Sequence, residues 1–102
     1  MAKTQLLPPI HPGEILREEF MAPLGLSANA VSLRLGVTAA RVNEIVKERR
    51  GITADTALRL ARLFSTTPEF WMNLQQRYEL ESARRQVGQD IAHTVFALPQ
   101  SV

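Results

Sequence analysis

Hydrogen-bonding and basic side chains are concentrated in one stretch of the chain, residues 38–50. Arg41 and Asn43 can hydrogen-bond base edges, and the best match for arginine is guanine and for asparagine adenine. Glu44 can accept from a cytosine amino group, or hold Arg41 by an ion pair on the same face of a helix. Three further cations suit contacts with phosphates and also complement the negative end of a helix dipole: Lys47, Arg49 and Arg50. The chemistry available to this stretch is therefore recognition of double-stranded DNA.

Two short helices joined by a tight turn, at 28–35 and 39–47, must position these side chains. Ser27 can cap the first helix and Thr38 the second, because a hydroxyl accepts a hydrogen bond from an unpaired amide of the first turn. Gly36 can adopt the left-handed conformation that ends the first helix. The spacing matches a helix-turn-helix, in which the outward face of the second helix is left for a DNA groove.

Apolar residues at helical spacing hold the two helices at a fixed angle. Val31 and Leu35 share a face of the first helix, and Val42 and Ile45 share a face of the second. Ser32 is small where the helices cross closely. We expect the DNA interface to comprise the second helix, the residues after it and the start of the first helix: Ser27, Ala28, Asn29, Thr38, Ala39, Ala40, Arg41, Asn43, Glu44, Lys47, Arg49 and Arg50. The alanines permit close approach and contact with a thymine methyl group.

Charge is distributed unevenly along the chain, although the net charge is only +2. Residues 34–62 carry seven basic and three acidic residues, a net +4, and the remainder carries five basic and seven acidic residues, a net −2. The basic excess coincides with the helix-turn-helix and the residues after it, as expected of a surface that binds phosphates. A solvated surface with scattered charges is the alternative explanation.

Three more helices complete the expected fold, at about 12–22, at 55–64 and from Pro68 onward. Thr53 or Asp55 can cap the second of these. Five helices with short connections predict an all-α class, a compact, lambda-repressor-like five-helix bundle containing the helix-turn-helix.

The expected organisation has three parts. We expect a mobile N-terminal segment at 1–11, a helix-turn-helix domain at 12–85 with its motif at 28–47, and a C-terminal tail at 86–102. Within that tail, residues 91–98 are apolar and β-branched, which favours a strand or a docked tail.

Trp71, Leu74 and Tyr78 form one stripe of the last helix, at spacings i, i+3 and i+7. A core that covers the other helices is one interpretation of this stripe. A dimer seam is the other, because aromatic residues are enriched in interface hot spots. The candidate dimer interface is Trp71, Leu74, Tyr78 and Leu80.

Length and composition exclude several classes of protein. A chain of 102 residues allows one domain with a modest core. No apolar run approaches the roughly 20 residues of a membrane-spanning helix, and no signal peptide is recognisable. The chain has no cysteine, which excludes disulfides and thiolate metal sites and fits a cytoplasmic protein.

No arrangement of catalytic or metal-binding groups is recognisable. The two histidines, His11 and His93, are far apart in sequence, and His11 suits the start of a helix. Glu18 and Glu19 are neighbours and point to different sides of a helix, and Asp55 is isolated in sequence. We therefore expect no enzyme activity, no metal site and no cofactor.

The stretch ANAVSLRLGVTAARVNEIVK resembles the Cro/CI-type (XRE) helix-turn-helix of phage repressors. It departs from many of them at Ala28, Ala39 and Ala40, where those repressors carry glutamine at the helix starts. Four stretches together resemble HigA/VapI-type antitoxins of type II toxin–antitoxin systems, over about residues 11–80: HPGEILREEF, LGLS, RVNEIVKERRGITADTALRLARLF and TTPEFWMNLQQRYEL. The resemblance implies a homodimer that binds operator DNA sequence-specifically and represses its own operon. It also implies that the protein neutralises a HigB-like toxin that cleaves mRNA.

Two other interpretations are open at this stage. One is a solitary transcriptional regulator of the same fold with no toxin partner. The other is a protein-interaction module whose helix-turn-helix no longer meets DNA, an idea supported by the three alanines and opposed by the basic face. A short basic toxin-like gene directly upstream would favour the antitoxin.

Overall fold

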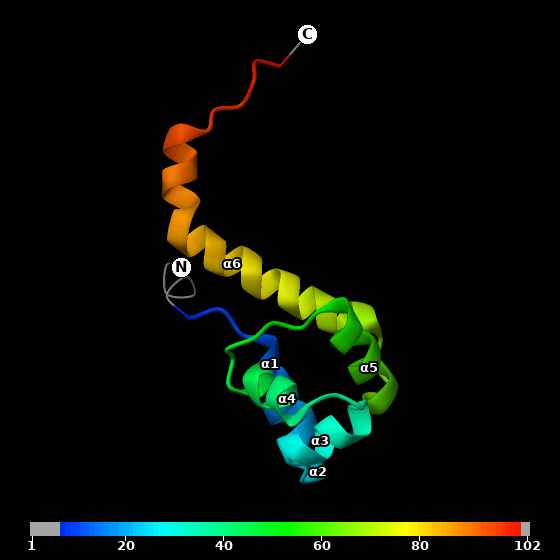
Figure 1. Cartoon of the computed structure of the whole chain (residues 1–102). Helices are drawn as coiled ribbons and strands as arrows, with labels where there is room; N and C mark the ends of the chain where they lie inside the picture. The colour runs from blue at the N-terminus through cyan, green and yellow to red at the C-terminus, as the bar shows by residue number, and fades with distance from the viewer. Residues whose placement is uncertain (1–6, 101–102) are drawn as a thin grey trace.

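The structure, a computed structural model, describes residues 7–100, and every regular element among them is a helix. In chain order the elements are α1 (Pro12–Ile15), the π-helix η2 (Leu16–Met21), α2 (Ala22–Leu24), α3 (Ala28–Leu35), α4 (Ala39–Val46), α5 (Ala54–Phe64) and α6 (Pro68–Thr94). Because α1, η2 and α2 follow one another without a break, the described residues form five helices (Figure 1). The predicted all-α class is confirmed.

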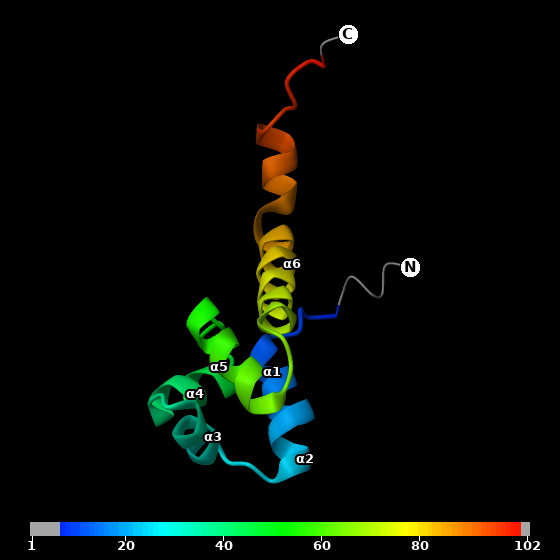
Figure 2. The same ribbon diagram turned by 90° about the vertical axis from the view of Figure 1, so that its right-hand side faces the viewer.

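The first half of α6 lies across the other helices, and its second half extends beyond them (Figure 1, Figure 2). α3 packs on α4, α5 packs on α6, and α1 contacts both α4 and α6. Because the second half of α6 extends beyond the other helices, the molecule is elongated, with overall extents of 55 × 32 × 22 Å. No helix of the described residues has both the length and the apolar character needed to cross a membrane.

The first helix is not the regular α-helix predicted at 12–22. Its middle is a π-helix, in which the Ala22 amide donates to the carbonyl of Arg17, five residues back. Pro23 explains the wider turn, because proline has no amide to donate and its ring clashes with the carbonyl four residues earlier in a regular α-helix. Gly25 ends the helix with φ +65°, as its position predicts.

Side-chain caps fix the helix starts where the sequence predicts them. Ser27 and Thr38 accept from the amides of Ala30 and Arg41, at 3.0 and 3.1 Å. Of the two candidates for α5, Thr53 is the cap. Thr67 and His11 cap α6 and α1, each followed by a proline at the first helical position. Each such cap typically stabilises a helix by about 1 kcal/mol.

Trp71 lies at the centre of the core, and its side chain is completely buried. The ring of Phe20 packs on the Trp71 ring, with 5.0 Å between the centroids. Trp71 Nε1 donates to the hydroxyl of Thr66 at 2.8 Å. The prediction that Trp71 lines a dimer interface is therefore wrong, because α6 turns this residue into the core, against Phe20 of η2. Along the same helix Leu74 and Tyr78 are half-buried, and Leu80 is exposed.

The predicted end of the domain at residue 85 falls inside α6, which continues to Thr94. The strand or docked tail expected at 91–98 is wrong: residues 91–94 are helical, and residues 95–100 are irregular and exposed. A strand needs a partner for its backbone, and no described residue provides one. Gly88 lowers helix propensity by about 1 kcal/mol relative to alanine, which does not end a helix. Of the predicted N-terminal segment at 1–11, residues 1–6 lie outside the described range.

Candidate nucleic-acid interface

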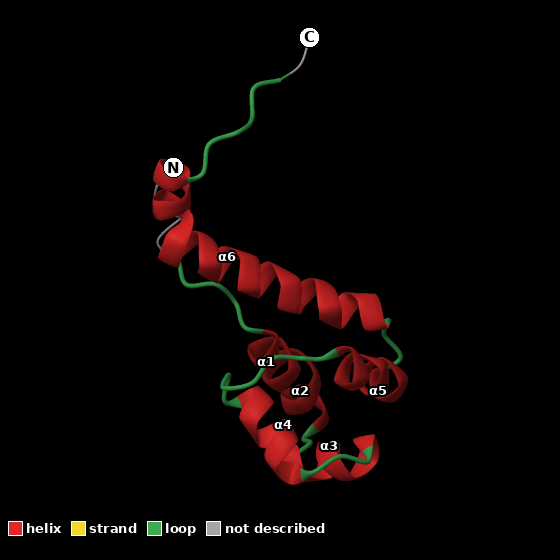
Figure 3. Cartoon of the chain, turned by 45° about the horizontal axis from the view of Figure 1, so that its top comes forward, coloured by secondary structure: helices red, strands yellow, loops and turns green. Residues whose placement is uncertain are grey.

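α3 and α4 form the helix-turn-helix that the spacing predicts (Figure 3). The four apolar residues that hold the two helices together are all buried: Val31, Leu35, Val42 and Ile45. Ser32 is buried beside them, and its hydroxyl donates to the carbonyl of Asn29 at 2.7 Å. Gly36 has φ +71° and Val37 donates back to the Ser32 carbonyl, which closes the turn. The packing and the closed turn therefore fix how α4 presents its outward side.

The predicted contact residues fall into two groups by exposure. Exposed are Ser27, Asn29, Thr38, Ala40, Lys47, Arg49 and Arg50. Half-buried are Ala28, Ala39, Arg41, Asn43 and Glu44. All belong to α3, α4, their caps or the turn after α4, so the fold brings them to one region of the surface.

The turn after α4 carries the predicted phosphate contacts. α4 ends at Val46, one residue earlier than expected, and Glu48 takes the left-handed conformation at φ +64°. Arg17 fixes this turn, because its guanidinium donates to the carbonyl of Val46 and pairs with the Glu48 carboxylate at 3.4 Å. Glu48 is thereby held by a cation from the first helix, while the three cations of the turn are exposed: Lys47, Arg49 and Arg50.

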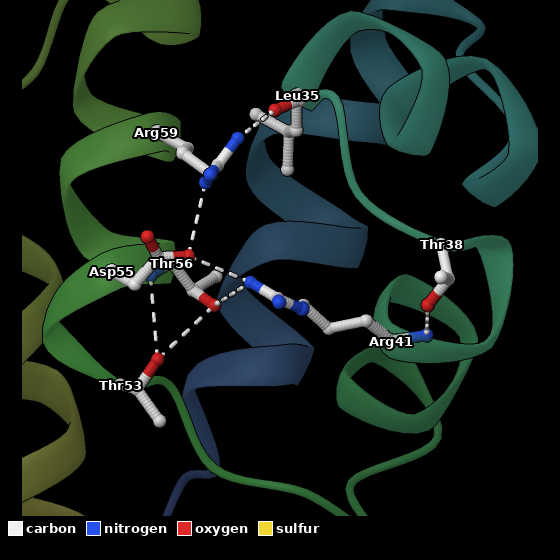
Figure 4. Close-up of polar contacts among 7 residues, drawn as sticks. All are labelled: Leu35, Thr38, Arg41, Thr53, Asp55, Thr56 and Arg59. Carbon is white, nitrogen blue, oxygen red and sulfur yellow. Dashed lines mark hydrogen bonds and ion pairs between the residues drawn. The ribbon is translucent and has the colours of Figure 1, made fainter.

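Arg41 is held by Asp55 rather than by Glu44. Its Nη1 lies 2.8 Å from Asp55 Oδ2 and 3.4 Å from the hydroxyl of Thr56, both in the first turn of α5 (Figure 4). The structure records no ion pair between Arg41 and Glu44 among the described residues. Sequence spacing identified a neighbour on the same helix, whereas the actual partner is brought close by the packing of α5.

Asp55, which looks isolated in the sequence, joins two arginines. Arg59 Nε also lies 3.0 Å from Asp55 Oδ2, and Arg59 Nη1 donates to the carbonyl of Leu35 at 2.8 Å (Figure 4). Hydrogen bonds from Arg41 first, and then from Arg59, lower the pKa of the Asp55 carboxyl. Sequence reasoning missed this link, although the i, i+4 spacing of Asp55 and Arg59 was a usable signal for half of it.

Asn43 uses its amide within α4. Its Nδ2 donates to the carbonyl of Ala39 at 3.0 Å, one turn earlier. Readout of adenine by this side chain therefore requires it to rotate away from its own helix.

Among the described residues, neither histidine joins a cluster of side chains that could hold a metal ion. His11 caps α1: its Nδ1 accepts from the Gly13 amide at 2.8 Å, which confirms its prediction as a helix-start residue. His93 is exposed near the end of α6. Within residues 7–100 no three side chains of histidine, cysteine, aspartate or glutamate come together in a way that could hold a metal ion.

Comparison with known proteins agrees with this geometry. A family model described as helix-turn-helix matches residues 16–71. Virulence-associated protein I of Dichelobacter nodosus is 56% identical over 79 residues, which are 78% of this chain and 73% of that protein. An uncharacterised HTH-type transcriptional regulator of Haemophilus influenzae is 44% identical over 72 residues, which are 71% of this chain and 67% of that protein.

A solved structure of the Pseudomonas aeruginosa antitoxin HigA with the higBA promoter is also similar. The two chains are 49% identical and superpose with a TM-score of 0.87, over 89% of this chain and 99% of that one.

Proposed function

We propose, from the premise that this chain belongs to the helix-turn-helix family of HigA- and VapI-type antitoxins, that it is a DNA-binding repressor of its own operon. This family is one of DNA-binding regulators and not of enzymes. The observation that carries the proposal is the close likeness to an antitoxin whose structure was solved with promoter DNA. The rigid α3–α4 motif and its solvent-facing polar side are what such a role requires.

Contact with DNA is assigned to the outward side of α4 and its surroundings. α4 would lie in the major groove, with Ala39 and Ala40 approaching the bases closely and Arg41 available for hydrogen bonds to a base edge. The turn after α4, with Lys47, Arg49 and Arg50, would contact phosphates, as would the N-terminus of α3 with Ser27 and Asn29. Asn43 and Glu44 would make further hydrogen bonds to base edges, and Ala28 would lie at the edge of the contact with DNA. A protein that binds operator DNA in this way would act in the cytoplasm.

The protein would act as a homodimer, because one such module contacts about half of an operator. The part of α6 from Leu80 onward supports a seam: the helix extends beyond the body (Figure 1) and carries exposed apolar residues, with Leu80 at 47%, Val87 at 42% and Ile91 at 50% exposure. A short helix that packs on nothing is marginal in water, so a partner covering this stripe would stabilise it. Leu74 and Leu80 also line an open hollow on α6, whereas Tyr78 would contribute only its exposed edge.

Neutralisation of a HigB-like toxin is the second half of the proposed function. We assign the toxin contact to residues outside α4, so that repression and neutralisation can occur in one complex. The N-terminal segment and the acidic side chains within residues 79–90 are the candidates, because an mRNA-cleaving toxin is expected to be basic. Glu79 and Asp90 are both exposed and lie about three turns apart on one side of α6, which is a different side from Leu80.

A solitary regulator with no toxin is the second candidate, favoured by the likeness to the Haemophilus influenzae protein named as an HTH-type transcriptional regulator. One experiment tests the DNA-binding function that both candidates share, and a second experiment separates them. The first measures binding to a duplex that the protein selects from a randomised pool and to a scrambled duplex of the same composition. Equal affinity for both contradicts the repressor.

The second experiment expresses the neighbouring reading frame with and without this protein. Growth arrest that this protein relieves supports the antitoxin. A harmless neighbour favours the solitary regulator. If crosslinking in the relieved complex placed the toxin on Arg41 and Lys47, the assignment of the toxin contact would be wrong.

A further inference from the structure

A hollow beside α4 is lined by three arginines and one carboxylate. Seven residues of α4, α5 and the loop between them line it: Arg41, Arg50, Gly51, Thr53, Asp55, Thr56 and Arg59. Asp55 is the one acidic residue in this lining. A carboxylate here opposes the binding of DNA phosphates, because it places a negative charge among the cations that would attract them. Its presence beside a DNA-binding surface therefore has a cost that some other role must offset.

The contact with Asp55 uses only one nitrogen of Arg41. Nη1 binds Asp55 Oδ2 and the Thr56 hydroxyl, while Nε and Nη2 have no hydrogen-bond partner among the described residues. A guanidinium is a rigid plane with five donors, so holding Nη1 sets the direction of the opposite Nε–Nη2 edge. That edge has the two parallel donors that bind guanine O6 and N7 in a bidentate manner.

Asp55 is itself held in place. The same oxygen, Oδ2, binds Nε of Arg59, and Arg59 is anchored to the Leu35 carbonyl at the end of α3. The carboxylate also lies in the first turn of α5, where the helix dipole favours an anion. A continuous path of polar contacts thus runs from α3 through Arg59 and Asp55 to Arg41 on α4 (Figure 4).

We propose that Asp55 is a positioning residue that sets the DNA sequence preference of this protein by fixing the guanidinium of Arg41. The proposal rests on the proposed function as a DNA-binding repressor and assigns specificity to a residue outside the helix-turn-helix. Asp55 acts in two ways. It aims one edge of Arg41 at a base, and it offsets the charge of Arg41, so that this side chain contributes little to binding of any phosphate.

The test is Asp55→Asn, measured by fluorescence anisotropy on the full chain with the two duplexes described above, the selected one and its scrambled counterpart. We expect tighter binding to the scrambled duplex and a fall of roughly tenfold in the ratio of the two affinities, because one good bidentate contact discriminates between bases by about that factor. Asp55 is exposed, so the variant should fold, which circular dichroism checks.

Glu48→Gln is the matched control, since it removes one negative charge from the turn after α4, where the carboxylate pairs with Arg17 and not with Arg41. It should tighten binding to both duplexes equally and leave their ratio unchanged. If Asp55→Asn behaves in the same way, Asp55 acts only through its charge and the proposal is wrong. In an Arg41→Ala background, Asp55→Asn should no longer change the ratio; a change of equal size there also overturns the proposal.

A readout without DNA separates this inference from the proposed function. The side-chain NMR signals of the Arg41 guanidinium should be resolved in the wild type and averaged in Asp55→Asn, because the hydrogen bond to Asp55 slows its rotation. If these signals behave as expected and the wild type binds both duplexes equally, the repressor function fails while the contact stands. If the wild type prefers the selected duplex and the Arg41 signals do not change, the inference alone fails.

Discussion

The side-chain Oε1 of Gln75 accepts a hydrogen bond from the backbone amide of Ile52 at 2.7 Å, and both groups are buried. The contact ties α6 to the loop between α4 and α5, across 23 residues of sequence. Gln75 Nε2 donates in turn to Glu79 at 2.7 Å, so the amide is satisfied at both ends. The loop that follows α4 is therefore positioned by a polar residue of α6.

Gln75→Leu should destabilise the protein by about 1–3 kcal/mol, because it leaves the buried Ile52 amide without a partner. For a domain of this size, each 1 kcal/mol lowers the melting temperature by roughly 4–8 °C. Thermal unfolding followed by circular dichroism measures the loss. Gln76→Leu, at the exposed neighbouring position, is the control and should change stability by no more than about 0.5 kcal/mol. Equal melting temperatures for the two variants would contradict the role assigned to Gln75.

The fold was predictable wherever local signals and packing agree. The hydroxyl caps at Ser27 and Thr38, the glycine at 36 and the apolar pairs of the motif each indicate the same two helices, and the structure confirms them. The π-helix before Pro23 was not predicted, because its cause lies in a clash that depends on the carbonyl positions of the preceding turn.

The site was predictable as a surface but not as a set of contacts. The outward side of α4 can be identified from sequence periodicity, because residues three and four positions apart lie on the same face of a helix. Periodicity cannot identify Asp55 as the partner of Arg41, because their meeting depends on the crossing of α4 and α5. The helical extension to Thr94 was missed for a related reason: apolar, β-branched residues favour a strand only where another strand is available.

Trp71 and Leu80, predicted together at an interface, should behave differently on substitution. Trp71→Ala should cost about 3–5 kcal/mol of stability, as expected for a large residue removed from a core.

Leu80→Lys should leave the melting temperature of the body nearly unchanged and shift the protein from dimer to monomer, because a charge would enter the proposed seam. Light scattering at micromolar concentration measures this shift. A wild type that is monomeric with and without DNA would contradict the dimer itself.

Stability should fall in acid through His11. Burial lowers the pKa of this histidine, partly opposed by the nearby negative charge of Glu48. Its Nδ1 must be unprotonated to accept from Gly13, so the unfolded chain binds a proton more readily than the folded one. The contribution of His11 to the free energy of unfolding is therefore fully present above the ordinary histidine pKa of about 6.5, and it declines as the pH falls below that value.

Urea unfolding between about pH 8 and pH 5 measures this dependence. His11→Asn can retain the cap while removing the titration, so its stability should vary less with pH than that of the wild type. His93→Gln, at an exposed position, should keep the full dependence. If His11→Asn and the wild type had the same pH profile, another group would be responsible.

Arg41 and Arg49 should affect DNA binding in different ways. Arg41 is held by Asp55 and is assigned to a base edge, so Arg41→Ala should cost about 1–3 kcal/mol per half-site and relax the preference at one base pair. Arg49 is exposed in the turn after α4 and is assigned to a phosphate. Arg49→Ala should weaken binding to all sequences and make the dependence on salt shallower by about one unit for each phosphate that is no longer neutralised.

Salt titrations of both variants, each against the selected and the scrambled duplex, distinguish these roles. The slope of log affinity against log salt reports the counterions released, and thus the phosphates neutralised, whereas the ratio of the two affinities reports base readout. Arg49→Ala should change the slope and keep the ratio; Arg41→Ala should reduce the ratio with a smaller change in slope. If Arg41→Ala weakened binding to both duplexes equally, Arg41 would bind a phosphate, and its role as a reader of sequence would be wrong.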